Sequence, residues 1–203
     1  MDVLVTGGTG FIGTHLCREL DDRGHDVTAF SRSPGDAALP DSVDQAVGDV
    51  TAYDSVAEAV EGHDAVVNLV ALSPLFKPKQ GDRRHMEVHL GGTENVVRAA
   101  EAAGVNYLLQ MSALDADSNG PTAYLRAKGK AEEVVRDSDL SYTIFRPSVI
   151  FGEGGEFVSF TKTLTTPYVT GLPGGGKSKF QPIWVQDLVP MLADAVEDDT
   201  HWG

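Results

Sequence analysis

The segment TGGTGFIG, residues 6–13, follows the apolar run VLV at residues 3–5 and precedes an amphipathic helical pattern. This order predicts a strand, a glycine turn and a helix, the arrangement that binds the pyrophosphate of a dinucleotide. Gly7 allows the tight turn, Gly10 lets the backbone approach the pyrophosphate, and Gly13 lets the helix pack against the strand. The unpaired N–H groups at the start of the helix then face the anion. The alternative is a glycine-rich turn without a ligand.

Strand and helix patterns alternate outward from this segment. Strands are expected at residues 2–6, 27–31, 45–47, 65–69, 107–111 and 141–145, and helices at 11–23, 53–61, 86–103, 122–137 and 185–196. Apolar strands that alternate with helices predict an α/β fold, a Rossmann-type doubly wound parallel sheet with helices on both faces. We expect one domain over residues 1–203, with an incomplete substrate-covering segment from about residue 148. Glycine-rich loops are expected at 151–155 and 172–176.

The charge of the chain excludes several classes of partner. Thirty acidic residues oppose sixteen basic ones, for a formal net charge of −14. This balance argues against nucleic acids and anionic membranes, which need basic patches. Lysine is scarce and aspartate outnumbers glutamate, a surface suited to cytoplasm of very high salt. We therefore expect a protein from a salt-loving organism; the alternative is an ordinary acidic protein.

Cysteine usage and the apolar pattern point to the cytoplasm. Cys17 is the single cysteine, so an internal disulfide is impossible, and it reads as a small buried apolar residue. The sequence has no basic region near Met1 of the kind that begins a signal peptide. It also has no uninterrupted apolar run long enough to span a membrane.

Ser31 and Arg32 end the second expected strand, where an NAD-selective protein usually carries an acidic residue. Arg32 can fork onto a 2′-phosphate or stack on an adenine. The sequence therefore favours NADP, with NAD as the alternative. The alternative role for Arg32 is that of a solvated loop residue.

Asp49 and Val50 follow the third expected strand. The Asp49 carboxylate can accept a hydrogen bond from the adenine amino group, or it can cap the next helix. After the fourth strand, the small residues near Leu69, Val70 and Ala71 would let the backbone approach a ribose.

Tyr124 and Lys128 lie one helical turn apart on one expected helix face. An ammonium group near a phenol favours the phenolate and lowers its pKa, which makes the tyrosine a general acid/base near neutral pH. Ser112 follows a strand end, so it can reach the same pocket and hold a carbonyl oxygen. Alone, a Y-x-x-x-K pattern is common on helix surfaces; here it follows the fifth strand of a chain that opens on TGGTGFIG.

With these residues the chain resembles the short-chain dehydrogenase/reductases of the extended or atypical kind, which include epimerase/dehydratase-like proteins. The resemblance rests on Gly7, Gly10, Gly13, Asp49, Ser112, Tyr124 and Lys128. RPSVIFG at 146–152 resembles the R-P-x-x-I-Y-G segment that borders the nicotinamide. The chain resembles one branch of these proteins at four segments: MSA at 111–113, residues 123–128, GGGK at 174–177 and FQPI at 180–183. That branch includes the NAD(P)H-binding accessory subunit of respiratory complex I and its prokaryotic relatives.

This resemblance implies an enzyme that transfers hydride to or from a carbonyl or alcohol. Tyr124 would be the general acid/base, Lys128 would also hold the nicotinamide ribose, and Ser112 would position the substrate oxygen. The residues expected at the cofactor are Gly7, Thr9, Gly10, Phe11, Ile12, Gly13, Ser31, Arg32, Asp49, Val50, Leu69, Val70, Ala71, Tyr124, Lys128 and Pro147. The alternatives are a non-catalytic accessory protein of a respiratory assembly and a nucleotide-sugar epimerase. The expected partners are a small-molecule substrate and either a second copy of the chain or a respiratory complex.

Two departures and two weaker signals complete the pattern. His89 stands where extended members often have the first asparagine of N-x-x-G-T-x-N, which puts an asparagine-based proton relay in doubt. The segment that closes over the substrate in extended members is mostly lacking.

HMEVH at 85–89 has the order H-x-E-x-H and not the H-E-x-x-H of a zinc helix, so no metal is expected. The basic residues among 77–84 read as a solvated loop, or alternatively as a lid that contacts an anionic substrate.

Overall fold

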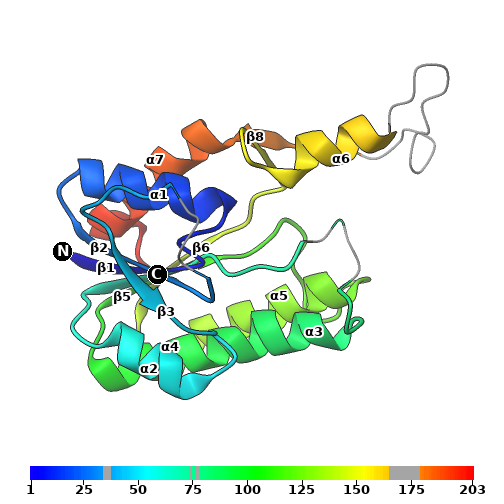
Figure 1. Ribbon diagram of the computed structural model, residues 1–203. Helices are drawn as coiled ribbons and strands as arrows, with labels where there is room; N and C mark the ends of the chain where they lie inside the picture. Colours follow the sequence, from blue (N-terminus) through cyan, green and yellow to red (C-terminus); the bar gives the residue numbers. More distant parts are fainter. Residues whose placement is uncertain (34–37, 74, 76–77, 165–178) are drawn as a thin grey trace.

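The computed structural model describes residues 1–33, 38–73, 75, 78–164 and 179–203 of the chain. Its centre is a parallel sheet of six strands in the order β3-β2-β1-β4-β5-β6 (Figure 1). The strands are β1 (Asp2–Thr6), β2 (Asp26–Ser31), β3 (Asp44–Val47), β4 (Ala65–Asn68), β5 (Tyr107–Met111) and β6 (Ser141–Phe145). The strand order reverses between β1 and β4, and the carboxyl ends at this switch point leave a crevice where ligands bind in such sheets. The expected Rossmann-type fold is confirmed.

The central strand β1 shows why helices cover both faces of the sheet. Val3 and Val5 pack into one core with helices α1 (Phe11–Asp22) and α7 (Val185–Glu197). Leu4 points the other way, into a second core with α2 (Tyr53–Val60), α4 (Gly92–Ala103) and α5 (Ala123–Arg136). Figure 1 shows the two groups of helices on opposite sides of the strands. Side chains alternate along a strand, so a run of apolar residues fills both cores at once.

Glycines end two of the expected helices as predicted. The residues Gly24 and Gly104 follow α1 and α4 with φ of +86° and +73°, a left-handed conformation that glycine adopts without steric cost. Cys17 is buried in α1 and is a free thiol, as expected.

The expected helix at 86–103 is part of a longer helical stretch that is not uniform. It begins with α3 (Arg83–His85), continues as the π-helical segment η1 (Met86–Gly91), and then becomes α4. A π-helical turn inserts an extra residue into an α-helix and often marks a functional site. No feature of the sequence pattern predicted it.

The chain beyond β6 is more regular than expected. Two short parallel strands, β7 (Val149–Phe151) and β8 (Pro182–Trp184), form a separate sheet. Helix α6 (Glu156–Leu164) follows β7, and η3 (Asp199–His201) lies near the end of the chain. The glycine-rich stretch 172–176 and the GGGK match at 174–177 lie outside the described residues. None of the helices in the described residues is long and apolar enough to cross a membrane.

Candidate active site

The glycine turn after β1 has the geometry that the sequence predicts. Gly7 has φ of +76°, and its N–H donates to the carbonyl oxygen of Phe30 on β2 at 2.8 Å. A Cβ atom at Gly13 would lie 2.2 Å from the carbonyl oxygen of Gly7. The first turn of α1 therefore packs directly on the glycine turn itself. Any larger residue at Gly13 would push the helix start away from this position.

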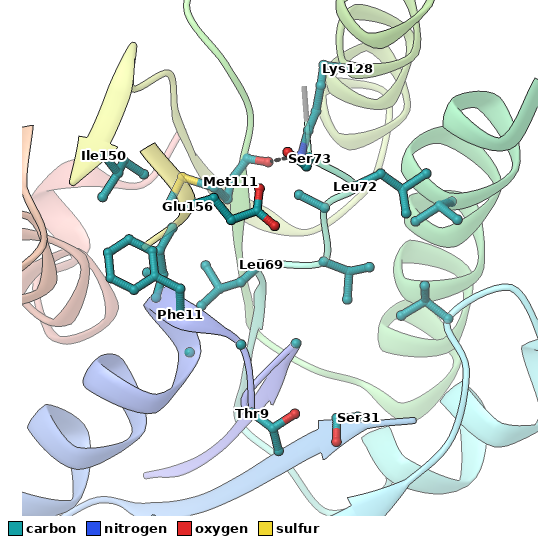
Figure 2. A pocket seen from close by; sticks show the side chains of 18 of the residues that line it. Thr9, Phe11, Ser31, Leu69, Leu72, Ser73, Met111, Lys128, Ile150 and Glu156 are labelled. Carbon is teal, nitrogen blue, oxygen red and sulfur yellow. Dashed lines mark hydrogen bonds between the residues drawn. The ribbon is translucent and has the colours of Figure 1, made fainter. Parts of the chain in front are cut away.

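A cavity of about 640 Å³ opens at the carboxyl ends of the central strands. That volume falls within the range of pockets that hold small molecules and cofactors. Every residue expected at the cofactor lines it, from Gly7 in the turn to Pro147 after β6, and Ser112 does so too. Figure 2 shows Thr9 and Ser31 together at one end of the cavity and Lys128 beside Ser73 and Met111 at the other. The structure thus gathers the expected residues around one extended space.

Asp49 lies where an adenine-binding acidic residue was expected, and one of its carboxylate oxygens already accepts hydrogen bonds from Thr51. Its Oδ1 accepts from the N–H of Thr51 at 2.9 Å and from the Thr51 hydroxyl at 2.8 Å. Burial raises the pKa of Asp49, but the Thr51 hydrogen bonds and the charges of Arg32 and Arg84 outweigh it, so the pKa is lowered. Helix α2 has Ala52 as its N-cap and no side-chain cap. The alternative in which Asp49 caps this helix is therefore wrong.

Tyr124 and Lys128 both face the cavity from α5, but the expected effect on the phenol is wrong. Lys128 is 1% exposed, and its Nζ donates to the carbonyl oxygen of Met111 at 2.7 Å. Burial lowers the pKa of Lys128 to about 8, although the negative charge of Glu132 acts to raise it. Burial also raises the pKa of Tyr124 to about 12. The phenol is therefore in its neutral form at neutral pH.

Ser112 is bound to a buried carboxylate that sequence reasoning missed. Its hydroxyl donates to Oε1 of Glu132, a side chain with 0% exposure on α5. Arg146 donates from Nε to the same oxygen at 2.8 Å and from a second nitrogen to Oε2, and Arg136 donates to Oε2 at 2.7 Å. Burial raises the pKa of Glu132, but the hydrogen bonds from these partners outweigh it, and the net pKa is lowered.

The ionisation of Glu132 fixes the hydrogen-bonding role of Ser112. An ionised carboxylate has only acceptors, and a serine hydroxyl has one hydrogen to donate. Because Ser112 gives that hydrogen to Glu132, its oxygen has only lone pairs left for the cavity. Holding a carbonyl oxygen needs a donor, which this arrangement directs at Glu132, so that role of Ser112 stays a prediction. Ser112 is placed to accept from a hydroxyl group.

Two histidines pack behind Tyr124. The rings of His85 and His89 stack at 5.5 Å between centroids, and each meets the Tyr124 ring edge to face, at 5.7 and 5.3 Å. His89 Nε2 accepts from the N–H of Leu72 at 3.4 Å, which places the ring hydrogen on Nδ1. Burial and the charge of Lys128 lower the pKa of His89 to about 2, so the ring is neutral. Within the described residues, neither Nδ1 atom has a hydrogen-bond partner.

Two carboxylates at the site, Glu132 and Glu156, were not recognised from the sequence. Glu132 lies one helical turn beyond Lys128, a spacing that places both on one helix face. Arg84 belongs to the basic cluster for which the sequence left two interpretations, a solvated loop or a lid that contacts an anionic substrate, and it lines the cavity. Of that cluster, Lys77 lies outside the described residues. Glu156 begins α6, an element that the sequence did not predict, and also lines the cavity (Figure 2).

Comparison with known sequences identifies relatives of several activities. The family model described as NAD(P)H-binding matches residues 7–167. The epimerase family protein SDR39U1 of Bos taurus is 30% identical over 221 residues, covering 97% of this chain and 70% of the relative. The NADH dehydrogenase [ubiquinone] 1 alpha subcomplex subunit 9 of Arabidopsis thaliana is 29% identical, covering 96% of this chain and 50% of the relative. A 3-beta-hydroxysteroid dehydrogenase of Mycolicibacterium neoaurum is 28% identical, covering 92% of this chain and 58% of the relative. The chain thus spans little more than half of several curated relatives.

Solved structures support the same fold. The UDP-glucose 4-epimerase of Thermus thermophilus in complex with NAD has a TM-score of 0.78 and 21% identity, covering 98% of this chain and 75% of the other. A dTDP-glucose 4,6-dehydratase from Streptomyces venezuelae with NAD bound has a TM-score of 0.80 and 20% identity, covering 98% and 73%. Three observations indicate the same family: the glycine turn, the cavity at the switch point of the sheet and the match over residues 7–167. The chain belongs to the NAD(P)H-binding family, as its resemblance to the extended or atypical short-chain dehydrogenase/reductases implies.

Proposed function

We propose that this protein is an NAD(P)-dependent oxidoreductase that moves a hydride between a nicotinamide and a carbonyl or alcohol carbon. The observation that carries the proposal is that one cavity is lined both by the glycine turn and by Tyr124 and Lys128. The glycine turn would hold the pyrophosphate against the start of α1. The nicotinamide supplies the redox chemistry, and the protein orients it and moves a proton.

Tyr124 would give a proton to the substrate oxygen, or take one from it. Its pKa of about 12 keeps the hydroxyl protonated at neutral pH, which suits a proton donor in reduction. An ammonium group has three N–H donors, and Lys128 gives one to Met111. The remaining donors are available to stabilise a phenolate and to hold ribose hydroxyls.

Ser112 would make the second polar contact to the reacting oxygen, beside that of Tyr124. Because its hydrogen bonds Glu132, it would accept from the hydroxyl of an alcohol. A carbonyl oxygen has no hydrogen to give, so this contact favours the alcohol over the ketone. Ser112 would therefore bind the alcohol form of the substrate, which is the product of the reduction that a protonated Tyr124 suits and the starting point of the reverse oxidation or of an epimerisation.

The preferred cofactor in this proposal is NADP. Strand β2 ends at Ser31 without a carboxylate, and Arg32 lines the cavity directly after it. A guanidinium fork matches a phosphate, whereas an NAD-selective site would offer an acidic residue to the ribose.

Two other functions have specific support. The similarity to subunit 9 of an NADH dehydrogenase favours a non-catalytic accessory role in a respiratory assembly. The similarity to an epimerase-family protein favours epimerisation, which would use the same proton-transfer groups with a transient ketone. The accessory role makes no use of the hydroxyl of Tyr124, so this residue separates it from the two enzymatic functions.

The test measures nucleotide binding and turnover in the same preparation. NADPH and NADH are titrated into the protein, and a panel of secondary alcohols and ketones is screened by nicotinamide absorbance. On a substrate that the parent converts, Tyr124→Phe is expected to remove nearly all turnover and to leave NADPH affinity unchanged. Tyr142→Phe is the control, because Tyr142 lies on β6 and does not line the cavity. Nucleotide binding without turnover of any panel member would favour the accessory role, and full activity in Tyr124→Phe would contradict the acid/base assignment.

A further inference from the structure

The carboxylate of Glu156 lies on the cavity wall and has no role in the function proposed above. Glu156 is the first residue of α6, it is exposed, and it lines the cavity. Within the described residues its carboxylate forms no ion pair or hydrogen bond. Asp49, the other acidic residue among the described lining residues, already accepts two hydrogen bonds from Thr51. The negative charge of Glu156 is therefore available to a ligand.

Tight packing at the preceding glycines fixes the place where α6 begins. A Cβ atom at Gly155 would lie 2.9 Å from the ring of Phe11, the first residue of α1. One at Gly152 would lie 2.5 Å from Val185, the first residue of α7. The loop before α6 thus packs against the starts of two helices that cover the same face of the sheet. The contact with Phe11 places Glu156 beside the helix that follows the glycine turn.

Glu156 lies at the end of the cavity that holds the candidate acid/base groups. In Figure 2 its carboxylate points into the open space at the end with Met111 and Lys128, away from Ser31. Tyr124 faces the cavity from one helical turn before Lys128. A dinucleotide with its pyrophosphate at the glycine turn and its adenine near Ser31 would bring its nicotinamide to the end with Glu156.

The charge of a nicotinamide ring depends on its redox state. The oxidised ring carries one positive charge, and the reduced ring is neutral. An unpaired carboxylate attracts the charged ring and has no net charge to attract in the neutral one. Lys128, the cation at this end, acts in the opposite sense, and a change at Glu156 alone leaves that contribution as it is. The two redox forms of a bound cofactor should therefore respond differently to Glu156.

We propose that Glu156 strengthens the binding of the oxidised nicotinamide cofactor relative to the reduced one. This inference rests on the proposed function, in which the cavity binds a nicotinamide dinucleotide. Ser112 acts in the same direction on the substrate, because its oxygen accepts a hydrogen bond from an alcohol. The two residues together stabilise the complex of an alcohol with the oxidised cofactor.

The test is isothermal titration of the full chain with NADP⁺ and NADPH, or with NAD⁺ and NADH if the parent binds these more tightly. Glu156→Gln removes the charge and keeps the size of the side chain. It should raise the ratio of the dissociation constants, oxidised over reduced, by about threefold or more, a size that attraction between charges near a protein surface reaches. Glu156→Lys should raise the ratio further. Glu153→Gln is the matched control with an unchanged ratio, because Glu153 is exposed in the same loop and does not line the cavity.

Salt separates an effect of charge from a change in the fold. The Debye length falls from about 10 Å at 0.1 M salt to about 3 Å at 1 M, so the difference between parent and Glu156→Gln should shrink over this range. A difference that salt leaves as it is would contradict the inference, and so would an unchanged ratio at 0.1 M salt. An equal change for both redox forms would overturn it too, because Glu156 would then act on the phosphates. A parent that binds neither form would instead refute the nucleotide site of the proposed function.

Discussion

The buried carboxylate of Glu132 offers a sharp test, because its neighbour Glu133 on the same helix is exposed. Glu132→Gln keeps the size of the side chain and removes its charge. An amide has one oxygen and one NH₂ group, so some of the donors that now reach the carboxylate would face another donor. We expect Glu132→Gln to lower the free energy of unfolding. Glu133→Gln should change it by less than about 0.5 kcal/mol.

The hydrogen bonds of Glu132 set the size of the loss. Charge-assisted hydrogen bonds contribute about 1.5–3 kcal/mol each, and neutral ones about 0.5–1.5 kcal/mol. The side chains of Arg136 and Arg146 are 44% and 43% exposed, so water replaces much of what they lose. Ser112 is 3% exposed and has no such exchange. The expected loss at neutral pH is therefore about 1–3 kcal/mol, close to the cost of one buried donor without a partner.

The pH dependence identifies the charge as the cause. Folding lowers the pKa of Glu132 below the value of about 4.3 of an unfolded glutamate. Its contribution to stability is therefore complete above about pH 4.3 and is lost as the pH falls through the folded pKa. Chemical denaturation of the parent and both variants, followed by circular dichroism from neutral to acid pH, measures this. The difference between parent and Glu132→Gln should be largest at neutral pH and should shrink in acid. A difference below about 0.5 kcal/mol at neutral pH, or one that acid leaves unchanged, would refute the reasoning.

Three further predictions concern pH, salt and the glycine turn. Because the pKa of Lys128 is lowered to about 8, turnover should fall as the pH rises through about 8 and the ammonium loses its proton; a rate profile that is flat across this range would contradict the role of Lys128. The thermal midpoint should rise from low ionic strength to molar potassium chloride, because salt screens the net charge of −14, and a midpoint that stays flat or falls would count against the salt-loving assignment. Gly13→Ala should cost about 1–3 kcal/mol in thermal unfolding and weaken NADPH binding, because the new Cβ would lie 2.2 Å from the Gly7 carbonyl oxygen. Gly91→Ala is its control, since a Cβ there would meet only the Met86 carbonyl oxygen at 3.8 Å, and equal effects of the two changes would be inconsistent with the proposed clash.

The parts of the fold that the sequence predicts are those with a local physical signal. The run at residues 3–13 combines apolar residues, a turn glycine and a helix start, so strand, turn and helix follow from adjacent residues. The helix before Gly104 is equally local, because a left-handed residue ends it. In contrast, β7 and β8 have three residues each. Strands this short have no room for an alternating pattern, and their pairing joins segments far apart in the chain.

The sequence predicted which residues line the candidate site better than it predicted their pKa values and hydrogen-bond directions. The positions of Tyr124 and Lys128 follow from helical spacing, and the structure brings both to the cavity. The pKa of Tyr124 depends on the extent of its burial, which spacing does not give. The hydrogen-bond direction of Ser112 depends on Glu132 and Arg146, which come from different elements. Tertiary contacts of this kind decide whether a hydroxyl donates or accepts.

The π-helical segment η1 has a geometric consequence for evolution and design. Successive residues of an α-helix are turned by about 100° around its axis. The wider turn at 86–91 holds one extra residue, so α4 keeps its apolar face in the core while Arg84 on α3 keeps its place on the cavity wall. Deleting one residue within η1 would turn the wide turn into an ordinary α-helical one and leave the orientation of α3 relative to α4 nearly unchanged. The same deletion within α4 would instead rotate the preceding residues by about 100° around the axis and move Arg84 off the wall. Segment η1 is thus the place in this helical stretch where a change of length is absorbed without any substitution in the hydrophobic core.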